Sequence, residues 1–201
     1  PLYSMPLATT NVKNLTRYVK SFMDHMGYEK AFLVGNSLGG HIALMMQKLY
    51  PNNVHGLILA GSSGLYESAM GNSYPRRGDR DYIAERIRDV FYVKEVATEE
   101  LIDEVFATVN DRNKAIKTLA ISKSAIRHNM SNDIKEFKVP TCIVWGRQDD
   151  VTPPEVADKF NNLMPNSELH WIDECGHAAM MERPEEFNTI IQKWLDKLLS
   201  N

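Results

Sequence analysis

The sequence predicts an α/β protein, in which a mostly parallel sheet carries helices on both faces and is interrupted by a helical insertion. Short apolar runs alternate with amphipathic helical patterns along most of the chain, an order that favours parallel strands joined by right-handed crossovers. The alternation breaks once, over 65–138, where three helical patterns follow one another without a good strand between them. We therefore expect a helical cap at 65–138 between two parts of one core, 1–64 and 139–201.

Four short and largely apolar runs predict the strands of the sheet. They lie at 30–36, 54–60, 139–145 and 167–173, and their length and composition are typical of buried strands.

Helical periodicity fills the stretches between these runs. The first helical pattern places four apolar residues on one face: Leu15, Val19, Phe22 and Met26. Thr9 or Thr10 is expected to cap its N-terminus. A later pattern begins with Thr152, Pro153 and Glu155, the arrangement of a capping box.

The octapeptide VGNSLGGH (34–41) holds Ser37 among three glycines, between a strand and a helix. A turn this sharp strains the serine backbone and brings neighbouring chain close. We expect that a Cβ at Gly35, Gly39 or Gly40 would collide with that chain. A serine presented in this way is typical of a nucleophile.

A serine hydroxyl needs a base to take its proton and an acid to orient that base. Both residue types follow Ser37 at predicted strand ends. Asp149 and Asp150 come after the third strand, and His177 comes after the fourth. Because the carboxyl ends of parallel strands meet at one edge of a sheet, we expect these side chains to lie near Ser37.

Three segments, taken in order, resemble the α/β-hydrolase superfamily: LVGNSLGGHIAL (33–44), IVWGRQDDVTPPEVADKF (143–160) and IDECGHAAMMERPEEFN (172–188). The resemblance implies a partial α/β-hydrolase fold with a helical cap and a Ser–Asp–His triad. In this family the acid stands three residues after the glycine of its W-G-x-x-D segment. Counted from Gly146, that spacing selects Asp149 over Asp150.

The resemblance gives each residue a role. Ser37 attacks a carbonyl carbon, His177 takes the serine proton and returns it to the leaving group, and Asp149 orients His177. The backbone N–H of Leu38, at the start of a helix, is expected to face the developing oxyanion.

The other five histidines are interpreted as structural or solvated. His25 and His41 fall on helical patterns, and His170 falls within a strand. His55 is expected to face solvent. His128 ends a cap helix, where a cation suits the helix dipole.

The substrate is less sharply defined. Asn36, beside the nucleophile, resembles the residue at that position in hydrolases that cleave carbon–carbon bonds of meta-ring-fission products, and it is a candidate substrate contact. Arg112 is a candidate for binding the substrate carboxylate. Ala178 stands where those enzymes usually carry tryptophan, and cofactor-free haloperoxidase-like esterases share the same triad. We therefore expect a small-molecule substrate that is either a small, largely apolar ester or a ring-fission dienoate.

Four cap residues are expected to point inward: Tyr66, Met70, Phe91 and Tyr92. A ligand-binding protein that keeps the triad without turnover is the alternative.

Composition excludes other classes of function. The net charge of −3 leaves no basic face for nucleic acid, and no stretch is apolar enough to enter a membrane. Two cysteines are too few for a disulfide framework, which favours a reducing, cytoplasmic location. No metal-ligand spacing occurs, so we expect no metal and no cofactor. A homo-oligomer stays open.

The strand at Lys30–Asn36 has a further expected property. Members of the resembled family have about four strands before the one that ends at the nucleophile, and a loop among them supplies a second oxyanion N–H. The opening PLYSMPLATT (1–10) offers neither. We therefore expect this strand at a sheet edge, able to pair with an N-terminal segment that the sequence lacks. The 201 residues alone are then expected to be poorly soluble or nearly inactive.

Overall fold

A parallel sheet of four strands lies at the centre of the structure, a computed structural model that describes residues 2–66 and 76–200. The strands follow one another across the sheet in chain order: β1 (Ala31–Asn36), β2 (Val54–Ala60), β3 (Thr141–Gly146) and β4 (Ser167–Ile172). This arrangement confirms the α/β class and the parallel pairing that the alternating pattern predicted.

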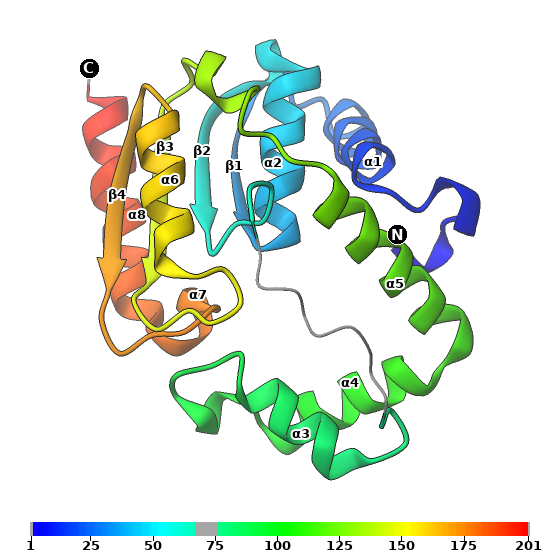
Figure 1. Ribbon diagram of the computed structural model, residues 1–201. Coiled ribbons are helices and arrows are strands. Elements are labelled where there is room, and N and C mark those ends of the chain that lie inside the picture. The colour runs from blue at the N-terminus through cyan, green and yellow to red at the C-terminus, as the bar shows by residue number, and fades with distance from the viewer. Residues whose placement is uncertain (1, 67–75, 201) are drawn as a thin grey trace.

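Helices cover both faces of the sheet (Figure 1). The helices α2 (Leu38–Leu49) and α6 (Pro154–Leu163) pack on one face, and α1 (Val12–His25) packs on α2. The short α7 (Ala179–Glu182) and the C-terminal α8 (Pro184–Leu199) cover the other face.

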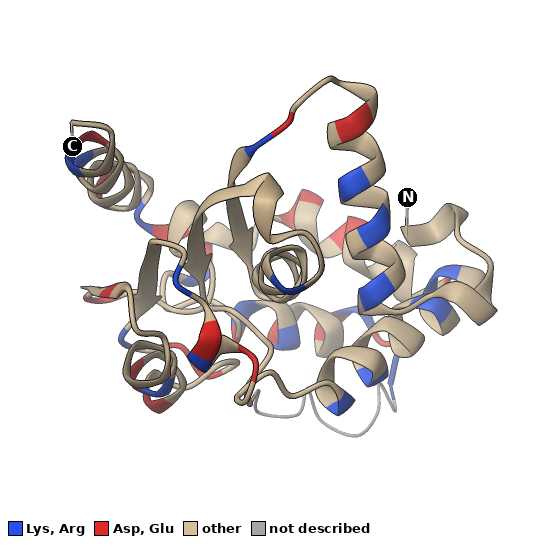
Figure 2. Ribbon diagram, turned by 90° about the horizontal axis from the view of Figure 1, so that it is seen from above, with Lys and Arg blue, Asp and Glu red and all other residues tan. Residues whose placement is uncertain are grey.

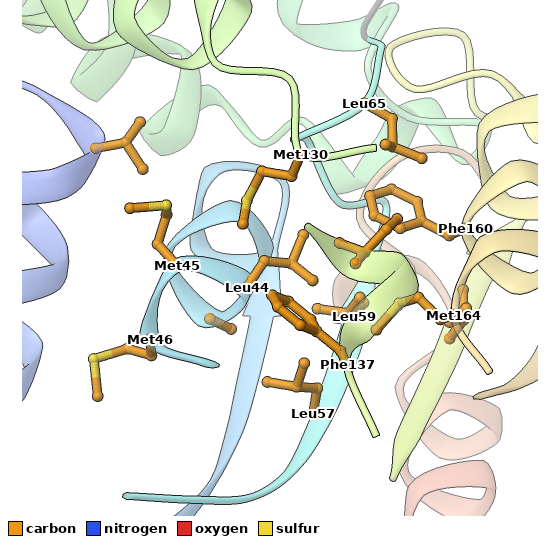
Figure 3. Close-up of a cluster of buried hydrophobic side chains, with 14 of the residues drawn as sticks. Leu44, Met45, Met46, Leu57, Leu59, Leu65, Met130, Phe137, Phe160 and Met164 are labelled. Atoms are coloured by element: carbon orange, nitrogen blue, oxygen red, sulfur yellow. The ribbon is translucent and has the colours of Figure 1, made fainter. Parts of the chain in front are cut away.

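Alternate residues of the strands feed two separate cores, as the two-residue period of a strand requires. Leu57 and Leu59 of β2 belong to the cluster formed with α2 and α6, which Figure 3 shows around Leu44 and Phe160. Ile58 and its alternating neighbours belong to the cluster under α8. The central strands are therefore apolar on both sides, which explains their continuous apolar runs.

The described part of 65–138, which is called the cap below, is helical and contains no strand. It holds α3 (Arg80–Arg88), α4 (Glu99–Asn110) and α5 (Arg112–Arg127), of which α3 and α4 lie beyond the carboxyl ends of the strands (Figure 1). An apolar cluster joins α3 and α4, and it includes Ala178 of the core.

The four cap residues expected to point inward have different positions. Phe91 is buried in the cluster that joins α3 and α4, whereas Tyr66 and Tyr92 are exposed. Met70 lies outside the described residues.

The first helix departs from its predicted caps and face. Its N-cap is Asn11, whose side-chain oxygen accepts the N–H of Asn14 at 2.9 Å, in place of Thr9 or Thr10. The exposed fractions of Phe22 and Met26, two residues of the predicted apolar face, are 59% and 47%. The face that is buried against α2 and α5 consists of Val12, Leu15, Thr16 and Met23.

Strand β1 lies at an edge of the described sheet, because it pairs with β2 alone. The edge leaves apolar surface uncovered, since Val34 of β1 is 60% exposed. By contrast, all six residues of the central strand β3 are buried. The edge position agrees with the expectation for Lys30–Asn36. Pairing with a further segment stays a prediction.

Charged side chains lie mainly on helices and loops, both in the part of the chain that contains the sheet and in the cap (Figure 2). Glu168 is the one Asp, Glu, Lys or Arg within the four described strands. No helix in residues 2–66 and 76–200 has the length and apolar character needed to cross a bilayer.

Candidate active site

Ser37 occupies the sharp turn between β1 and α2, with φ of +51° and ψ of −116°. A residue other than glycine is strained at a positive φ of this kind. Three backbone hydrogen bonds hold it there: the Ser37 N–H donates to Ala60 at 3.0 Å, and its carbonyl accepts from His41 and Ser63 at 3.2 and 3.1 Å. The first turn of α2 begins with Leu38, whose N–H is among those that a helix cannot satisfy internally.

Two of the three glycines around Ser37 permit close backbone contact. A Cβ on Gly35 would lie 2.2 Å from the carbonyl carbon of Gly39, and one on Gly40 would lie 2.2 Å from Ser62 Oγ. The collision expected at Gly39 is wrong, because a Cβ there would meet nothing within 4 Å. The Cβ position of Gly39 therefore faces open space.

His177 and Asp149 form a buried pair at the ends of β4 and β3. Nδ1 of His177 lies 2.9 Å from Oδ2 of Asp149, and the two residues are 6% and 1% exposed. Asp150 is exposed, so the structure brings to His177 the carboxylate that the spacing selected. With Nδ1–H donating to Asp149, Nε2 is left to act as a base.

Asp149 is held by hydrogen bonds from its own loop. Its Oδ1 accepts the N–H groups of Val151 and Thr152, each at 2.9 Å, and its Oδ2 accepts the Thr152 hydroxyl at 2.8 Å. The capping role predicted for Thr152 is wrong, because α6 begins at Pro154 and no side chain caps it. The signal that could have identified this contact is a hydroxyl three residues after the acid, just beyond the Asx turn that the Val151 N–H closes on Asp149.

The end of β2 approaches the His177–Asp149 pair closely. A Cβ on Gly61, whose φ is +47°, would lie 2.9 Å from His177 Nδ1 and 3.1 Å from Asp149 Oδ2. Asn36 joins the strand ends, since its Nδ2 donates to the carbonyls of Ala60 and His177, each at 3.0 Å. Both amide hydrogens of Asn36 are thus used on backbone, at a position where a substrate contact was expected.

A buried carboxylate that sequence reasoning missed lies beside this loop. Glu182 accepts the N–H of Gly176 on Oε1 at 3.0 Å, and the N–H groups of Tyr92 and Val93 on Oε2 at 2.7 and 3.0 Å. It therefore joins the loop of His177 to the cap. Its position five residues after His177 was visible in the sequence, but nothing in the pattern pointed to the cap.

Ser37 and His177 come to the same edge of the sheet without a direct hydrogen bond. Asn36 links them, because it precedes Ser37 and its amide donates to the His177 carbonyl and to the Ala60 carbonyl, which also accepts the Ser37 N–H. Among the described residues no hydrogen bond links Ser37 Oγ to His177, which differs from the contact expected for a triad. Such contacts are often longer before substrate binds.

Arg112 is the first residue of α5 and is exposed. In the described part of the chain it makes no hydrogen bond or ion pair, and the structure does not bring it to Ser37, Asp149 or His177.

Two histidines, His41 of α2 and His128 at the end of α5, contact each other, and the N–H of His41 donates to the Ser37 carbonyl. His41 Nε2 and His128 Nδ1 are 2.9 Å apart, and His41 Nδ1 lies 3.4 Å from Ser63 Oγ. Burial, followed by the neighbouring His128, lowers the pKa of His41 to about 4. Burial and then Lys48 also lower the pKa of His128, which disfavours the cationic form expected for this residue.

Neither cysteine has the character of a nucleophile. Burial raises the pKa of the Cys142 and Cys175 thiols to about 12, which keeps both protonated at neutral pH. Within residues 2–66 and 76–200, no group of three or more His, Cys, Asp or Glu side chains is arranged to hold a metal ion.

Comparisons of sequence give this geometry a context. The sequence model of the alpha/beta hydrolase family matches residues 4–190. The chain is 31% identical over 193 residues to a 2-hydroxy-6-oxononadienedioate/2-hydroxy-6-oxononatrienedioate hydrolase of Comamonas testosteroni. It is 29% identical over 193 residues to a 2-hydroxy-6-oxo-6-phenylhexa-2,4-dienoate hydrolase of Burkholderia cepacia. Each match covers 89% of this chain and 67% of the relative, so the chain spans about two thirds of their length.

Solved structures show the same fold. An alpha/beta hydrolase enzyme from the metagenome of sediments of the Mar Chica lagoon, Morocco, is 49% identical and superposes with a TM-score of 0.78 over 98% of this chain and 75% of that one. A meta-cleavage product hydrolase of Pseudomonas fluorescens has a TM-score of 0.78 over 93% of this chain and 72% of that one, at 20% identity. The second likeness shows the fold alone.

Proposed function

This chain belongs to the alpha/beta hydrolase family, and we propose that it is a serine hydrolase with Ser37 as nucleophile, His177 as general base and Asp149 as the residue that orients the base. The observation that carries the proposal is the combination of a strained serine at one strand end with a buried His–Asp pair at two others. Strain of this kind persists where the surrounding structure holds it for a function.

The proposed reaction follows from the positions of these groups. Ser37 Oγ attacks the substrate carbonyl carbon while His177 Nε2 takes the hydroxyl proton. The oxyanion faces the N–H of Leu38 at the start of α2. The bond to the leaving group then breaks, and the leaving group receives the proton from His177. A water molecule, activated by the same histidine, releases the acyl group and restores Ser37.

The names of the relatives suggest the class of substrate. Both curated relatives quoted above are hydrolases of 2-hydroxy-6-oxo dienoates. We place such carbon–carbon-bond substrates first and small, largely apolar esters second. Because the chain spans about two thirds of those relatives, both assignments are proposals.

A direct experiment compares both substrates on the purified protein. Hydrolysis of 2-hydroxy-6-oxo-6-phenylhexa-2,4-dienoate and of p-nitrophenyl butyrate is followed by absorbance, with Ser37→Ala as the variant and Ser62→Ala as the matched control. We expect Ser37→Ala alone to abolish turnover. Equal turnover by Ser37→Ala and the wild type would contradict the proposal.

Covalent labelling distinguishes an enzyme from a binding protein. A serine-directed fluorophosphonate is expected to leave one adduct, located on Ser37 by peptide mass spectrometry. Tight binding of the dienoate without turnover, together with no adduct on Ser37, would favour the ligand-binding alternative.

A further inference from the structure

Three polar atoms meet in a triangle on the buried side of the candidate base. Thr152 Oγ1 lies 2.8 Å from Asp149 Oδ2 and 3.2 Å from His177 Nδ1, and those two atoms are 2.9 Å apart. All three side chains are buried. The hydroxyl therefore touches both partners of the His–Asp pair.

The protons of the triangle can be placed from the chemistry of its groups. An ionised Asp149 only accepts, so the single hydroxyl proton of Thr152 is donated to Oδ2. The oxygen of that hydroxyl then presents its lone pairs to His177 Nδ1. With two acceptors and no donor facing it, Nδ1 must carry the imidazole proton, and Nε2 is the free base.

The backbone of this loop is held without the hydroxyl. The N–H of Thr152 donates to Asp149 Oδ1 at 2.9 Å, and the carbonyl of Thr152 accepts the indole N–H of Trp145 at 2.8 Å. The hydroxyl caps no helix either, since α6 has no side-chain cap. The contacts of the hydroxyl with Asp149 and His177 therefore serve neither the loop backbone nor a helix cap.

We propose that Thr152 is a positioning residue of the hydrolase: its hydroxyl orients Asp149, shares the negative charge of Oδ2 and fixes the proton of His177 on Nδ1. The inference rests on the proposed function for its kinetic consequence. Its structural consequence, the state of the Nδ1 proton, exists whether or not the protein turns over a substrate.

Kinetics of two matched variants test the proposal. Thr152→Val removes the hydroxyl, whereas Thr152→Ser keeps it. We expect Thr152→Val to lower kcat by about 10- to 100-fold, as for loss of a hydrogen bond to a charged group, with little change in KM. Thr152→Ser should restore kcat. Thr141→Val removes a buried hydroxyl that donates to the Val139 carbonyl and has no other hydrogen bond among the described residues, and this control should leave kcat unchanged.

The pH profile separates positioning from packing. Without the hydroxyl, the full charge of Oδ2 acts on His177 and favours the protonated ring. The acid limb of kcat/KM is therefore expected to move to higher pH in Thr152→Val and to stay in place in Thr152→Ser and Thr141→Val. Wild-type kcat and pH profile in a folded Thr152→Val, or equal damage in Thr152→Ser, would overturn the proposal.

Proton NMR tests the same contact without any substrate. The hydrogen-bonded Nδ1 proton of His177 should give a downfield signal that is shared by the wild type and Thr152→Ser and is displaced in Thr152→Val. If Thr152→Val does not fold, Thr152→Ala replaces it. An unmoved signal in the folded hydroxyl-deleted variant refutes the role of Thr152, whereas a displaced signal in a protein without turnover refutes only the hydrolase assignment.

Discussion

The backbone N–H of His177 donates to the carbonyl oxygen of Val90 at 3.0 Å, so the candidate base is hydrogen-bonded directly to the cap. On its other side, the carbonyl of His177 accepts an amide hydrogen of Asn36, the residue before the nucleophile. The backbone of one residue thus bridges the cap and the nucleophile strand. We therefore expect the position of the base to depend on the contact with the cap.

Glu182→Gln is expected to loosen that bridge. The Glu182 carboxylate accepts three backbone N–H groups, and an amide would turn a donor toward at least one of them. We expect a loss of about 1–3 kcal/mol in the free energy of unfolding, the cost of an unsatisfied buried donor. Urea denaturation measures it. The exposed Glu186→Gln is the control, and equal stability of the two variants would count against the bridge.

Asp149→Asn should impair turnover far more than Asp150→Asn. The amide lacks the charge that stabilises the His177 cation and favours the wrong tautomer of the ring, which in serine proteases costs about 10,000-fold in kcat. Asp150 is exposed, so its substitution should change kcat less than about 3-fold. The measurement is kcat for the better of the two proposed substrates. A similar loss in both variants would show that the acid was assigned wrongly.

Gly35→Ala and Gly39→Ala are expected to differ sharply in stability, although both glycines flank Ser37. A Cβ on Gly35 would lie 2.2 Å from backbone, whereas one on Gly39 would meet nothing within 4 Å. We expect Gly35→Ala to prevent folding or to lower stability by at least about 3 kcal/mol. Gly39→Ala should be neutral or stabilise α2 by up to about 1 kcal/mol. Thermal denaturation compares them, and a soluble, fully stable Gly35→Ala would contradict the close approach.

His41 should make the protein lose stability as the pH falls. Its pKa drops from an ordinary 6.5 to about 4 in the folded state, so the unfolded chain binds the proton more readily. The contribution is complete above pH 6.5 and is lost toward pH 4, with a total of about 3 kcal/mol. Urea unfolding at pH 7.5 and 4.5 should therefore show a smaller loss in His41→Gln than in the wild type. Equal losses in the two proteins would rule out this contribution.

The strands were predictable because burial on both faces leaves a continuous apolar run in the sequence. The run at 54–60 matches β2 at both ends, whereas the run at 139–145 begins two residues before β3. Pro140 explains that difference, since proline has no N–H to give to a ladder and is disfavoured inside a central strand.

The candidate nucleophile, base and acid were also predictable, because strand ends in a parallel sheet converge whatever the intervening chain does. The groups that hold them were not. Thr152 matched a capping box as well as an acid partner, and only the fold decides between two local hydrogen bonds of similar strength. Glu182 and its donor Tyr92 are about 90 residues apart in the sequence, and no periodicity records a contact of that kind.

The indole of Trp145, which donates to the Thr152 carbonyl, gives the acid loop a natural optical reporter. Trp145 is completely buried, whereas Trp171 is partly exposed beside Arg147. Trp194 belongs to α8 and is buried on the opposite face of the sheet. Water reaching the Trp145 ring would shift its fluorescence to longer wavelength. With Trp171 and Trp194 replaced by phenylalanine, the wavelength of maximum emission of the unlabelled protein would report how closely the loop that carries Asp149 packs on Trp145.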